Sequence, residues 1–243
     1  MPEKSFFYIH SQGTLQKVST IEELLVHLKD GGYAWLDFFD PTEQDLVALK
    51  EPFGVHPLSI EDCLDQDQVP KIEDFPAITF ILLNGCRYEH GEILLEEADL
   101  ILGKNYLVTV SGHAGGSLKL YEKVQHPVTL DPQGIKRGPD FLLHVVMDIL
   151  VDLKFAAIES LQDAIDRSEE EILNNPIAFR PERLIHLRRQ LLTLRKSLFH
   201  EREILMKICR RDSPHISEKA IYHFRDIYDH LAKYFEIVEI SGK

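Results

Sequence analysis

GVHPLSIEDCLDQDQVPKIE, residues Gly54–Glu73, is the stretch that most constrains the fold of this chain. Pro57 lacks a backbone N–H and has a φ suited to the first turn of a helix, so a short helix is predicted to begin near it. The adjacent carboxylates Glu61 and Asp62 follow one turn later. Two interpretations are open here: the acids offset the positive end of the helix dipole, or they bind a cation.

The charge balance favours cations as ligands. Among 243 residues, 40 are acidic and 27 are basic, which leaves a formal charge of −13. Such a charge repels phosphate backbones, so the sequence disfavours nucleic acid as a partner. Cys63, Cys86 and Cys209 are far apart and form no CxxC pair, so neither a disulfide framework nor a zinc ribbon is predicted.

Neither secretion nor a membrane span is predicted within the chain. The N-terminus has no basic start followed by a sustained apolar core, as a signal peptide would have. The most apolar run, Phe141–Ile149, is interrupted by His144 and Asp148. It is also far shorter than the roughly 20 apolar residues that a membrane helix needs. We therefore expect a soluble chain in a reducing cytoplasm.

The first half of the sequence is rich in strand patterns. Turn residues at Asn84-Gly85, His90-Gly91 and Gly103-Lys104-Asn105 separate the segments, and short helical patterns cover Ile21–Leu28 and Pro41–Phe53. The expected strands are Ser5–His10, Tyr33–Phe38, Ala77–Asn84, Ile93–Leu102 and Tyr106–Ser111. These patterns predict a mixed sheet flanked by helices, with the single tryptophan, Trp35, in the core.

The second half is helical after Pro139. Leucines at 184, 187, 191, 194 and 198 alternate spacings of three and four, which is typical of a coiled-coil-like seam. Asn174-Asn175-Pro176 predicts a break between two long antiparallel helices, and Ser213-Pro214 ends the second. The first arm is acidic and the second basic, which favours a hairpin. A third helix is expected from about Glu218.

The helix that begins near Pro139 carries a polar stripe. His144, Asp148 and Asp152 recur every four residues and so share one face of an otherwise apolar helix. A buried carboxylate needs a partner or a metal ion. The alternative is that the stripe faces water or pairs with Arg137 or Arg225.

The third helix contains a second set of metal-ligand types. Asp226 and His230 are four residues apart, and Asp229 precedes His230. Carboxylates without nearby cysteine favour the hard cations Mg²⁺ and Ca²⁺. Other histidines, among them His113, have no ligand spacing, and Cys63 is interpreted as a small core residue.

The order of these motifs resembles the cytosolic half of the CorA family of magnesium transporters over nearly the whole chain. The motifs are HPL-x-x-ED-x-L, PK-x-E, D-x-x-x-D and FRD-x-YDH, in that order. The resemblance implies an α/β fold, a mixed sheet in an α/β/α sandwich, over residues 1–138. Residues 139–243 would form a long helical hairpin and the start of a stalk helix, truncated before the membrane helices. The parent would be a homopentamer in the cell membrane with this part on the cytoplasmic face.

The resemblance also implies roles for individual residues. Asp62 matches a carboxylate that faces the stalk of a neighbouring subunit, and Asp226 matches the stalk carboxylate that it meets. Glu61 and Asp148 match the acids of a second cation position, beside which lie Asp152 and His230. The implied ion is Mg²⁺, with Co²⁺, Ni²⁺ and Ca²⁺ as further candidates. The implied function is Mg²⁺ sensing that stabilises a closed transporter.

Three other interpretations remain open at the level of sequence. A cytosolic domain of a ZntB-like zinc transporter would share the fold. A metal-dependent hydrolase could use clustered His and Asp to activate water, but the sequence has no HExxH pattern, nucleophile elbow or Gly-rich phosphate loop. We therefore predict that the chain is not an enzyme. The third alternative is a helical adaptor without a metal role.

Overall fold

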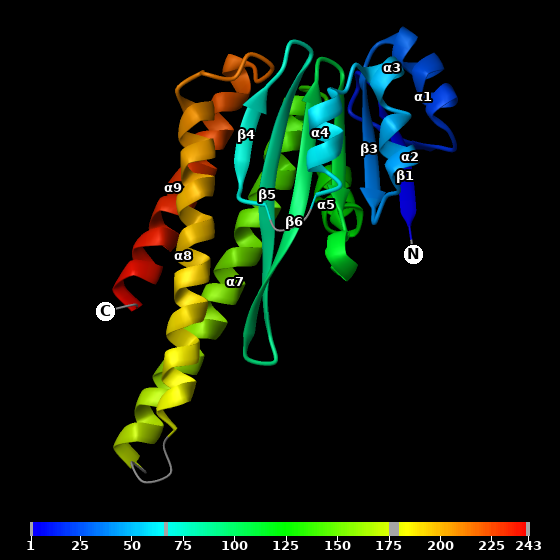
Figure 1. Cartoon of the computed structure of the whole chain (residues 1–243). Helices are drawn as coiled ribbons and strands as arrows, with labels where there is room; N and C mark the ends of the chain where they lie inside the picture. Colours follow the sequence, from blue (N-terminus) through cyan, green and yellow to red (C-terminus); the bar gives the residue numbers. More distant parts are fainter. Residues whose placement is uncertain (1, 66–67, 175–179, 242–243) are drawn as a thin grey trace.

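The computed structural model describes residues 2–65, 68–174 and 180–241, which form a sheet and a set of long helices (Figure 1). The strands are β1 (Glu3–Ile9), β2 (Leu15–Val18), β3 (Tyr33–Phe39), β4 (Lys71–Asp74), β5 (Ile78–Glu89), β6 (Glu92–Gly103) and β7 (Tyr106–Ser111). The helices are α1 (Ile21–His27), α2 (Glu43–Val47), α3 (Lys50–Phe53), α4 (Pro57–Asp62), α5 (Leu120–Leu130), α6 (Pro132–Ile135), α7 (Pro139–Asn174), α8 (Pro181–Cys209) and α9 (Glu218–Ser241), with 3₁₀ turns η1 (Leu28–Asp30) and η2 (His113–Gly115).

The seven strands form one mixed sheet in the order β2-β1-β3-β7-β6-β5-β4. The pairing of β3 with β7 is parallel, and the other pairings are antiparallel. In the β6–β7 pair, Ala98 lies opposite Ser111, so the residues that follow β7 run past the middle of β6. This register brings η2 beside Glu97 and Asp99 of β6.

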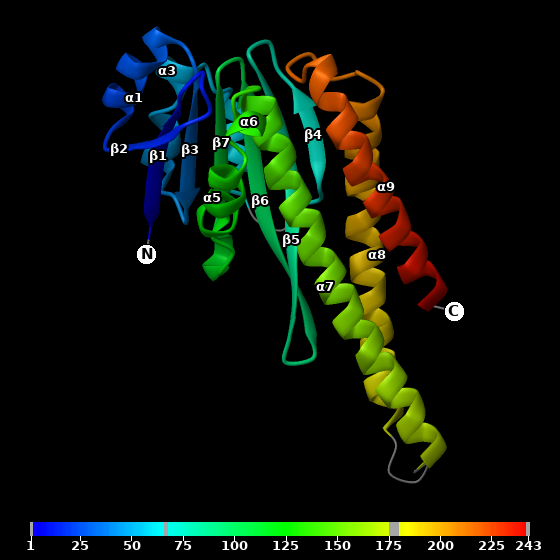
Figure 2. The ribbon, with the colours of Figure 1, turned by 180° about the vertical axis from the view of Figure 1, so that it is seen from behind.

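Helices cover both faces of the sheet, as the resemblance implied. Figure 1 shows α4 in front of the sheet, and Figure 2, from behind, shows α5 and α7 across the other face. The two faces bury separate apolar clusters, one with Phe38, Ile60 and Phe80 under α4, the other with Trp35 and Leu142 under α5 and α7. The predicted α/β/α sandwich and the core position of Trp35 are confirmed.

A buried ion pair fastens the long helices to the sheet. Lys154 of α7 and Glu201 of α8 are both fully buried, with 3.1 Å between Nζ and Oε2. Lys154 also donates to the carbonyl oxygen of Asn84 in β5, whose N–H donates to Glu201 Oε1 over 3.0 Å. Because each charge has a partner and the backbone of β5 adds hydrogen bonds, much of the cost of desolvating this pair is offset, although Glu201 Oε2 makes no hydrogen bond of ordinary geometry among the described residues.

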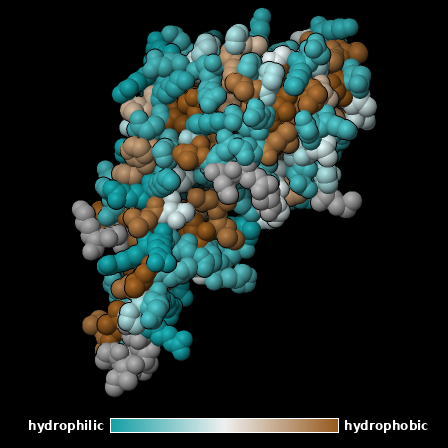
Figure 3. Space-filling model, in the orientation of Figure 1, coloured by the Kyte–Doolittle hydropathy of each residue, from teal (hydrophilic) through white to brown (hydrophobic). Residues whose placement is uncertain are grey.

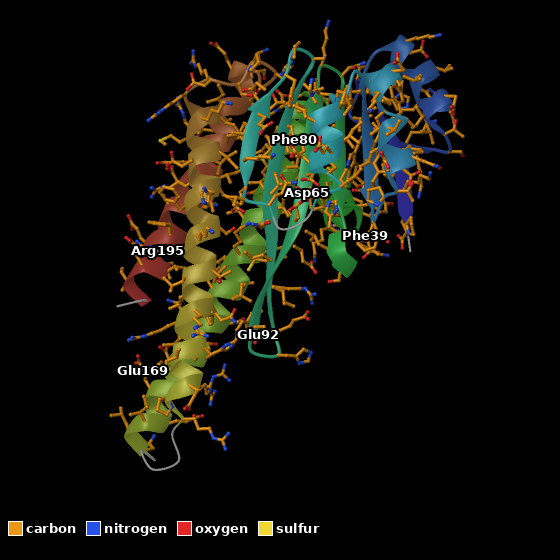
Figure 4. All side chains as sticks on the ribbon, in the orientation of Figure 1. Phe39, Asp65, Phe80, Glu92, Glu169 and Arg195 are labelled. Atoms are coloured by element: carbon orange, nitrogen blue, oxygen red, sulfur yellow. The ribbon has the colours of Figure 1, made fainter. Side chains whose placement is uncertain are left out.

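The helical hairpin and the third helix also form as predicted. Arg183 of α8 lies 2.8 Å from Glu171 of α7, which confirms a contact between the basic and acidic arms. Arg195, labelled in Figure 4, instead pairs with Glu239 of α9 over 2.7 Å. The predicted break at 174–176 lies mostly outside the described residues, since residues 175–179 are not among them.

The predicted turn at Asn84-Gly85 is wrong, because both residues lie within β5. Gly85 pairs with Glu96 of β6, and a Cβ on it would lie 2.6 Å from the side chain of Leu118. The glycine therefore permits close packing within a strand. The turn forms at His90-Gly91, where both residues have positive φ. The sequence patterns also missed β2 and β4, which have four residues each.

The surface in the view of Figure 1 is mainly hydrophilic, with apolar side chains scattered among the polar ones (Figure 3). Leu173 of α7 and Ile185 and Leu192 of α8 are exposed apolar residues of the hairpin. Among the described residues, none of the helices combines the length and the apolar character needed to span a bilayer. The division at residue 138 stays a prediction, although α7 does begin at Pro139.

Candidate metal centres

The stripe on α7 meets α9 in a cluster of potential metal ligands. Asp148, Asp152 and His230 each offer one ligand atom, and these atoms lie within 4.8 Å of one another. Asp148 and His230 are half-buried, and Asp152 is exposed. The cluster forms because the i, i+4 spacing on α7 places both acids on the face that packs against α9.

The electrostatics of this cluster leave room for a cation. Burial raises the pKa of Asp148, the Asp152 carboxylate raises it further, and His230 opposes both effects. His230 Nδ1 is buried and has no hydrogen-bond partner among the described residues. Across that same part of the chain, neither Asp148 nor Asp152 pairs with a lysine or arginine. A divalent ion would supply the missing positive charge.

His144, one turn before Asp148, lies in a different environment. Its ring is 5.0 Å from that of His223, centroid to centroid, and Arg137 donates to His223 Nε2 over 2.8 Å. Burial, together with the nearby His223 and Arg137, lowers the pKa of His144 to about 4 against the opposing effect of Asp226. His144 is therefore neutral at pH 7. Arg137 pairs with a histidine and leaves the two acids of α7 unpaired.

Asp226 lies beside the α7/α9 cluster, one turn before His230. It is exposed, and it is close enough to His144 and Asp148 to shift their pKa values. Asp229, in contrast, is exposed and interacts with Cys209 of α8. Asp148, Asp152 and Asp226 therefore form an acidic patch open to solvent on one side.

Asp62 and Glu61 lie on the other face of the sheet. They are the last two residues of the six-residue helix α4, which is capped by His56. The prediction that they lie near the positive end of the helix dipole is therefore wrong, because they lie at the C-terminal end of the helix, which is the negative end of the dipole. Asp62 Oδ1 accepts from Lys71 Nζ over 2.7 Å, and Glu61 is exposed. A cation at Asp62 has to compete with Lys71.

A single chain does not bring all the predicted ligands together. Asp148, Asp152 and His230 converge with Asp226 beside them, but Asp62 belongs to α4, which packs on the opposite face. The carboxylates of the α7/α9 cluster fit a hard cation such as Mg²⁺. An imidazole is a poor ligand for this ion, so the cluster fits Mg²⁺ best if His230 binds it through a water.

A second cluster was missed by the sequence analysis. Glu97 and Asp99 of β6 and His113 of η2 offer ligand atoms within 4.8 Å of one another. The sequence shows no ligand spacing for His113, yet the fold brings its ring beside both acids. The sequence does contain a signal for the two acids of this cluster. They are two residues apart in an apolar strand, so their side chains lie on the same face of the sheet. The contribution of His113 depends on the pairing of Ala98 with Ser111, which the sequence does not reveal.

Comparison with known proteins identifies the family. The family model for "CorA-like Mg2+ transporter protein" matches residues 30–242. The cobalt/magnesium transport protein CorA of Thermotoga maritima is 32% identical over 92% of this chain, which spans 64% of the length of that protein. The soluble domain of CorA from Methanocaldococcus jannaschii superposes with a TM-score of 0.80 at 18% identity, covering 99% of this chain and 92% of that one.

A further solved domain shares the fold. The cytoplasmic domain of ZntB from Vibrio parahaemolyticus has a TM-score of 0.70 at 11% identity, covering 98% of this chain and 91% of that one. A likeness at that identity shows the fold alone, so the assignment to a family comes from the sequence matches. The chain belongs to the family of CorA-like Mg²⁺ transporter proteins.

Proposed function

We propose that this chain is the Mg²⁺-sensing part of a divalent-ion transporter that moves Mg²⁺, and also Co²⁺ and Ni²⁺, into the cytoplasm. The observation that carries the proposal is the convergence of Asp148, Asp152 and His230 from two helices in a member of this family. The Thermotoga relative is named a cobalt/magnesium transport protein. The relatives bear transporter names, which favours a role other than catalysis.

In the proposed site, Asp148 and Asp152 bind a hydrated Mg²⁺ ion, and Asp226 adds negative charge beside it. Mg²⁺ sheds its waters reluctantly, so a site with two carboxylates and several retained waters binds weakly. Weak binding suits the sensing of an abundant ion. His230 holds one of the waters through a ring nitrogen, and the pKa of Asp148, raised by burial and by Asp152, falls when the ion binds.

Regulation is proposed to act between subunits of a homo-oligomer, a pentamer in the full-length parent. Asp62 of one subunit then meets Asp226 of its neighbour, and Glu61 lies next to that contact. A bound ion cancels the repulsion between the carboxylates and stabilises the closed ring, whereas loss of the ion loosens it. Differential affinity for the closed state shifts the population. The Lys71 side chain leaves Asp62 when the ion arrives.

The site within one chain is tested by thermal unfolding of the purified protein with and without Mg²⁺. Wild type is expected to gain several degrees in melting temperature at millimolar Mg²⁺, by mass action. Asp148→Asn combined with Asp152→Asn is expected to remove most of that gain. Glu203→Gln, an exposed acid on α8, is the matched control and keeps it. An unchanged Mg²⁺ response in the double variant rejects the site.

The proposed contact between subunits has a separate test. Mg²⁺-dependent protection from proteolysis is measured in the full-length transporter for wild type, Asp62→Ala and Asp226→Ala. Both variants are expected to lose protection equally, because each removes one side of the same contact. Unchanged protection in both contradicts the assignment of Asp62 and Asp226, while leaving the α7/α9 site intact.

A zinc-transporting role is the second candidate, favoured by the imidazole of His230 in the cluster and by the shared fold with the ZntB domain. The same thermal experiment separates the two. A larger shift with micromolar Zn²⁺ than with millimolar Mg²⁺, lost in Asp152→Asn, favours zinc. Calcium, cobalt and nickel are compared in parallel.

A further inference from the structure

Glu97, Asp99 and His113 form a cluster that the proposed magnesium sites do not use. Glu97 and Asp99 extend from β6, on the face covered by α4, and His113 lies in the turn that follows β7. His113 Nε2 is 2.9 Å from Asp99 Oδ2. Asp99 has no exposed surface, and 12% of the His113 side chain is exposed. Pairing of β6 with β5 and β7 fixes the backbone at Glu97 and Asp99, and the turn that carries His113 follows β7 directly.

One oxygen of each carboxylate in this cluster lacks a partner in the described part of the chain, whereas Asp99 Oδ2 lies 2.9 Å from His113 Nε2 and Glu97 also interacts with the backbone N–H of Gln68. Asp99 Oδ1 and Glu97 Oε1 are buried, and neither has a hydrogen-bond partner among the described residues. The Cys63 thiol lies next to Asp99 and interacts with it, but it is a weak donor and makes no hydrogen bond of ordinary geometry to Oδ1. Buried polar atoms without partners are rare in native proteins, and they point to an absent water or ion.

No strong base neutralises the cluster within the described part of the chain. Arg87, which lines the same cavity, pairs with Glu89 and Glu96, and Lys71 pairs with Asp62 and Glu73. The imidazole is therefore the single positive group available to two acids. Burial and, second to it, the Asp99 carboxylate raise the pKa of Glu97 to about 7. A divalent cation would balance both carboxylates at once.

The cluster is accessible from solvent. Glu97 and His113 line a cavity of about 440 Å³, together with Gln68, Asn84 and Gly116. Asp65, which follows α4, interacts electrostatically with Glu97, and Figure 4 places it in front of the sheet near β6. The negative potential at the mouth of the cavity favours the entry of a cation. Asp99 itself is fully buried, with the buried Cys63 thiol beside it.

We propose that Glu97, Asp99 and His113 bind a divalent transition-metal ion of the Zn²⁺ and Co²⁺ class, at a site separate from the magnesium-sensing residues. One imidazole nitrogen and two carboxylate oxygens are the ligand types that these ions take, with a water from the cavity as the fourth ligand. Mg²⁺ is disfavoured because it needs six oxygens in near-ideal octahedral positions. The Cys63 sulfur is not among the ligand atoms that lie within 4.8 Å of one another, so it is outside the proposed ligand set.

The site lies beneath the helix that carries Glu61 and Asp62. Asp99 contacts Cys63, the C-cap of α4, and the charge of Asp62 raises the pKa of Asp99 further after burial. An ion at this site removes that repulsion. Its occupancy therefore stabilises the packing of α4 on the sheet.

The experiment uses untagged, chelator-treated protein, titrated with Zn²⁺ by calorimetry and with Co²⁺ by visible absorption. Wild type is expected to bind one ion per chain at this site and to show the intense absorption of Co²⁺ with a low coordination number. Glu97→Gln and His113→Gln are each expected to weaken binding by at least about tenfold. His126→Gln, an exposed histidine on α5, is the matched control and retains wild-type affinity. The double variant Asp148→Asn with Asp152→Asn also retains this site, which separates the result from the proposed function.

Two results overturn the proposal. The first is the absence of Zn²⁺ and Co²⁺ binding by wild type. The second is binding that survives in both Glu97→Gln and His113→Gln. If melting temperatures fall in these variants but wild type shows no metal-dependent shift, Asp99 and His113 form a structural ion pair only. Glu97 is half-buried, so Glu97→Gln is expected to fold even if changes at the fully buried Asp99 prevent folding.

Discussion

The two faces of the sheet differ in how their buried charges are balanced. On the α7 face, Lys154 and Glu201 neutralise each other with both side chains fully buried. On the α4 face, Glu97 and Asp99 share one histidine, and no lysine or arginine among the described residues pairs with either of them. Buried charged side chains therefore have two different roles in this protein. A closed pair fastens helices to a strand, whereas an incomplete set is suited to a ligand from outside.

The largest expected effect is on the closed pair. Lys154→Ala leaves Glu201 buried without its partner, and the free energy of unfolding is expected to fall by about 3–5 kcal/mol. Lys71→Ala is the matched control on the opposite face. Its pair with Asp62 is partly exposed, at 28% and 19% of the side chains, so the expected loss is below about 1 kcal/mol. Urea unfolding of both variants measures the difference, and equal losses would contradict the contrast between the faces.

A second test uses a buried carboxylate on the α5 side of the sheet. Asp37 of β3 accepts from Thr109 Oγ1 over 2.5 Å, and burial raises its pKa from 3.8 to about 7. Between these values the folded state binds more protons than the unfolded chain, so this residue makes stability fall as pH rises from about 4 to 7. Asp37→Asn is expected to remove that dependence and to stabilise the protein at pH 8 by at most about 4 kcal/mol.

The control for this test is Asp40→Asn, an exposed residue after the same strand whose positive φ asparagine tolerates. Unfolding is measured at pH 4.5 and pH 8 for wild type and both variants. The stabilisation by Asp37→Asn should appear in full at pH 8 and fall to about a quarter of that value at pH 4.5, because the unfolded carboxyl is already largely ionised there. A variant that is destabilised equally at both pH values would show that the charged form of Asp37 is not penalised.

The smallest expected effect concerns the outer face of the helices. Arg195 and Glu239 link α8 to α9 with side chains 49% and 42% exposed. Because water and salt screen this pair, Arg195→Ala is expected to cost less than about 1 kcal/mol, and less still at high ionic strength. Arg183→Ala, which breaks a comparable pair with Glu171, is expected to behave alike. A loss near that of Lys154→Ala would remove the distinction between buried and exposed pairs.

Much of the helical half follows from local pattern. The starts of α7 at Pro139 and α9 at Glu218 agree with the predictions. Proline and serine set these boundaries through interactions within a single helical turn, so the local sequence is enough to predict them. The meeting of Asp148 and Asp152 was also predictable, since helical geometry sets which residues share a face. His230 meets these two acids because α9 packs against α7. Helix geometry alone does not predict this packing, and it was expected from the family resemblance. The predicted roles of Asp62 and Asp226 across subunits stay predictions.

In the sheet half, local signals are weaker and partners are distant in sequence. The turn signal at Asn84-Gly85 failed because long-range pairing with β6 overrides a two-residue preference. The dipole interpretation of Glu61 and Asp62 failed because α4 has only six residues. The short strands β2 and β4 have too few residues to show an alternation.

The sequence by itself determined the family, the order of sheet and hairpin, and the helix-borne carboxylates, because these depend on motifs and on contacts within a few residues. Tertiary structure alone decided the pairing of Lys154 with Glu201 and the meeting of His113 with Glu97 and Asp99. Strand register and helix crossing create those contacts between residues far apart in the chain. Their energies depend on burial, which has no local signature in the sequence.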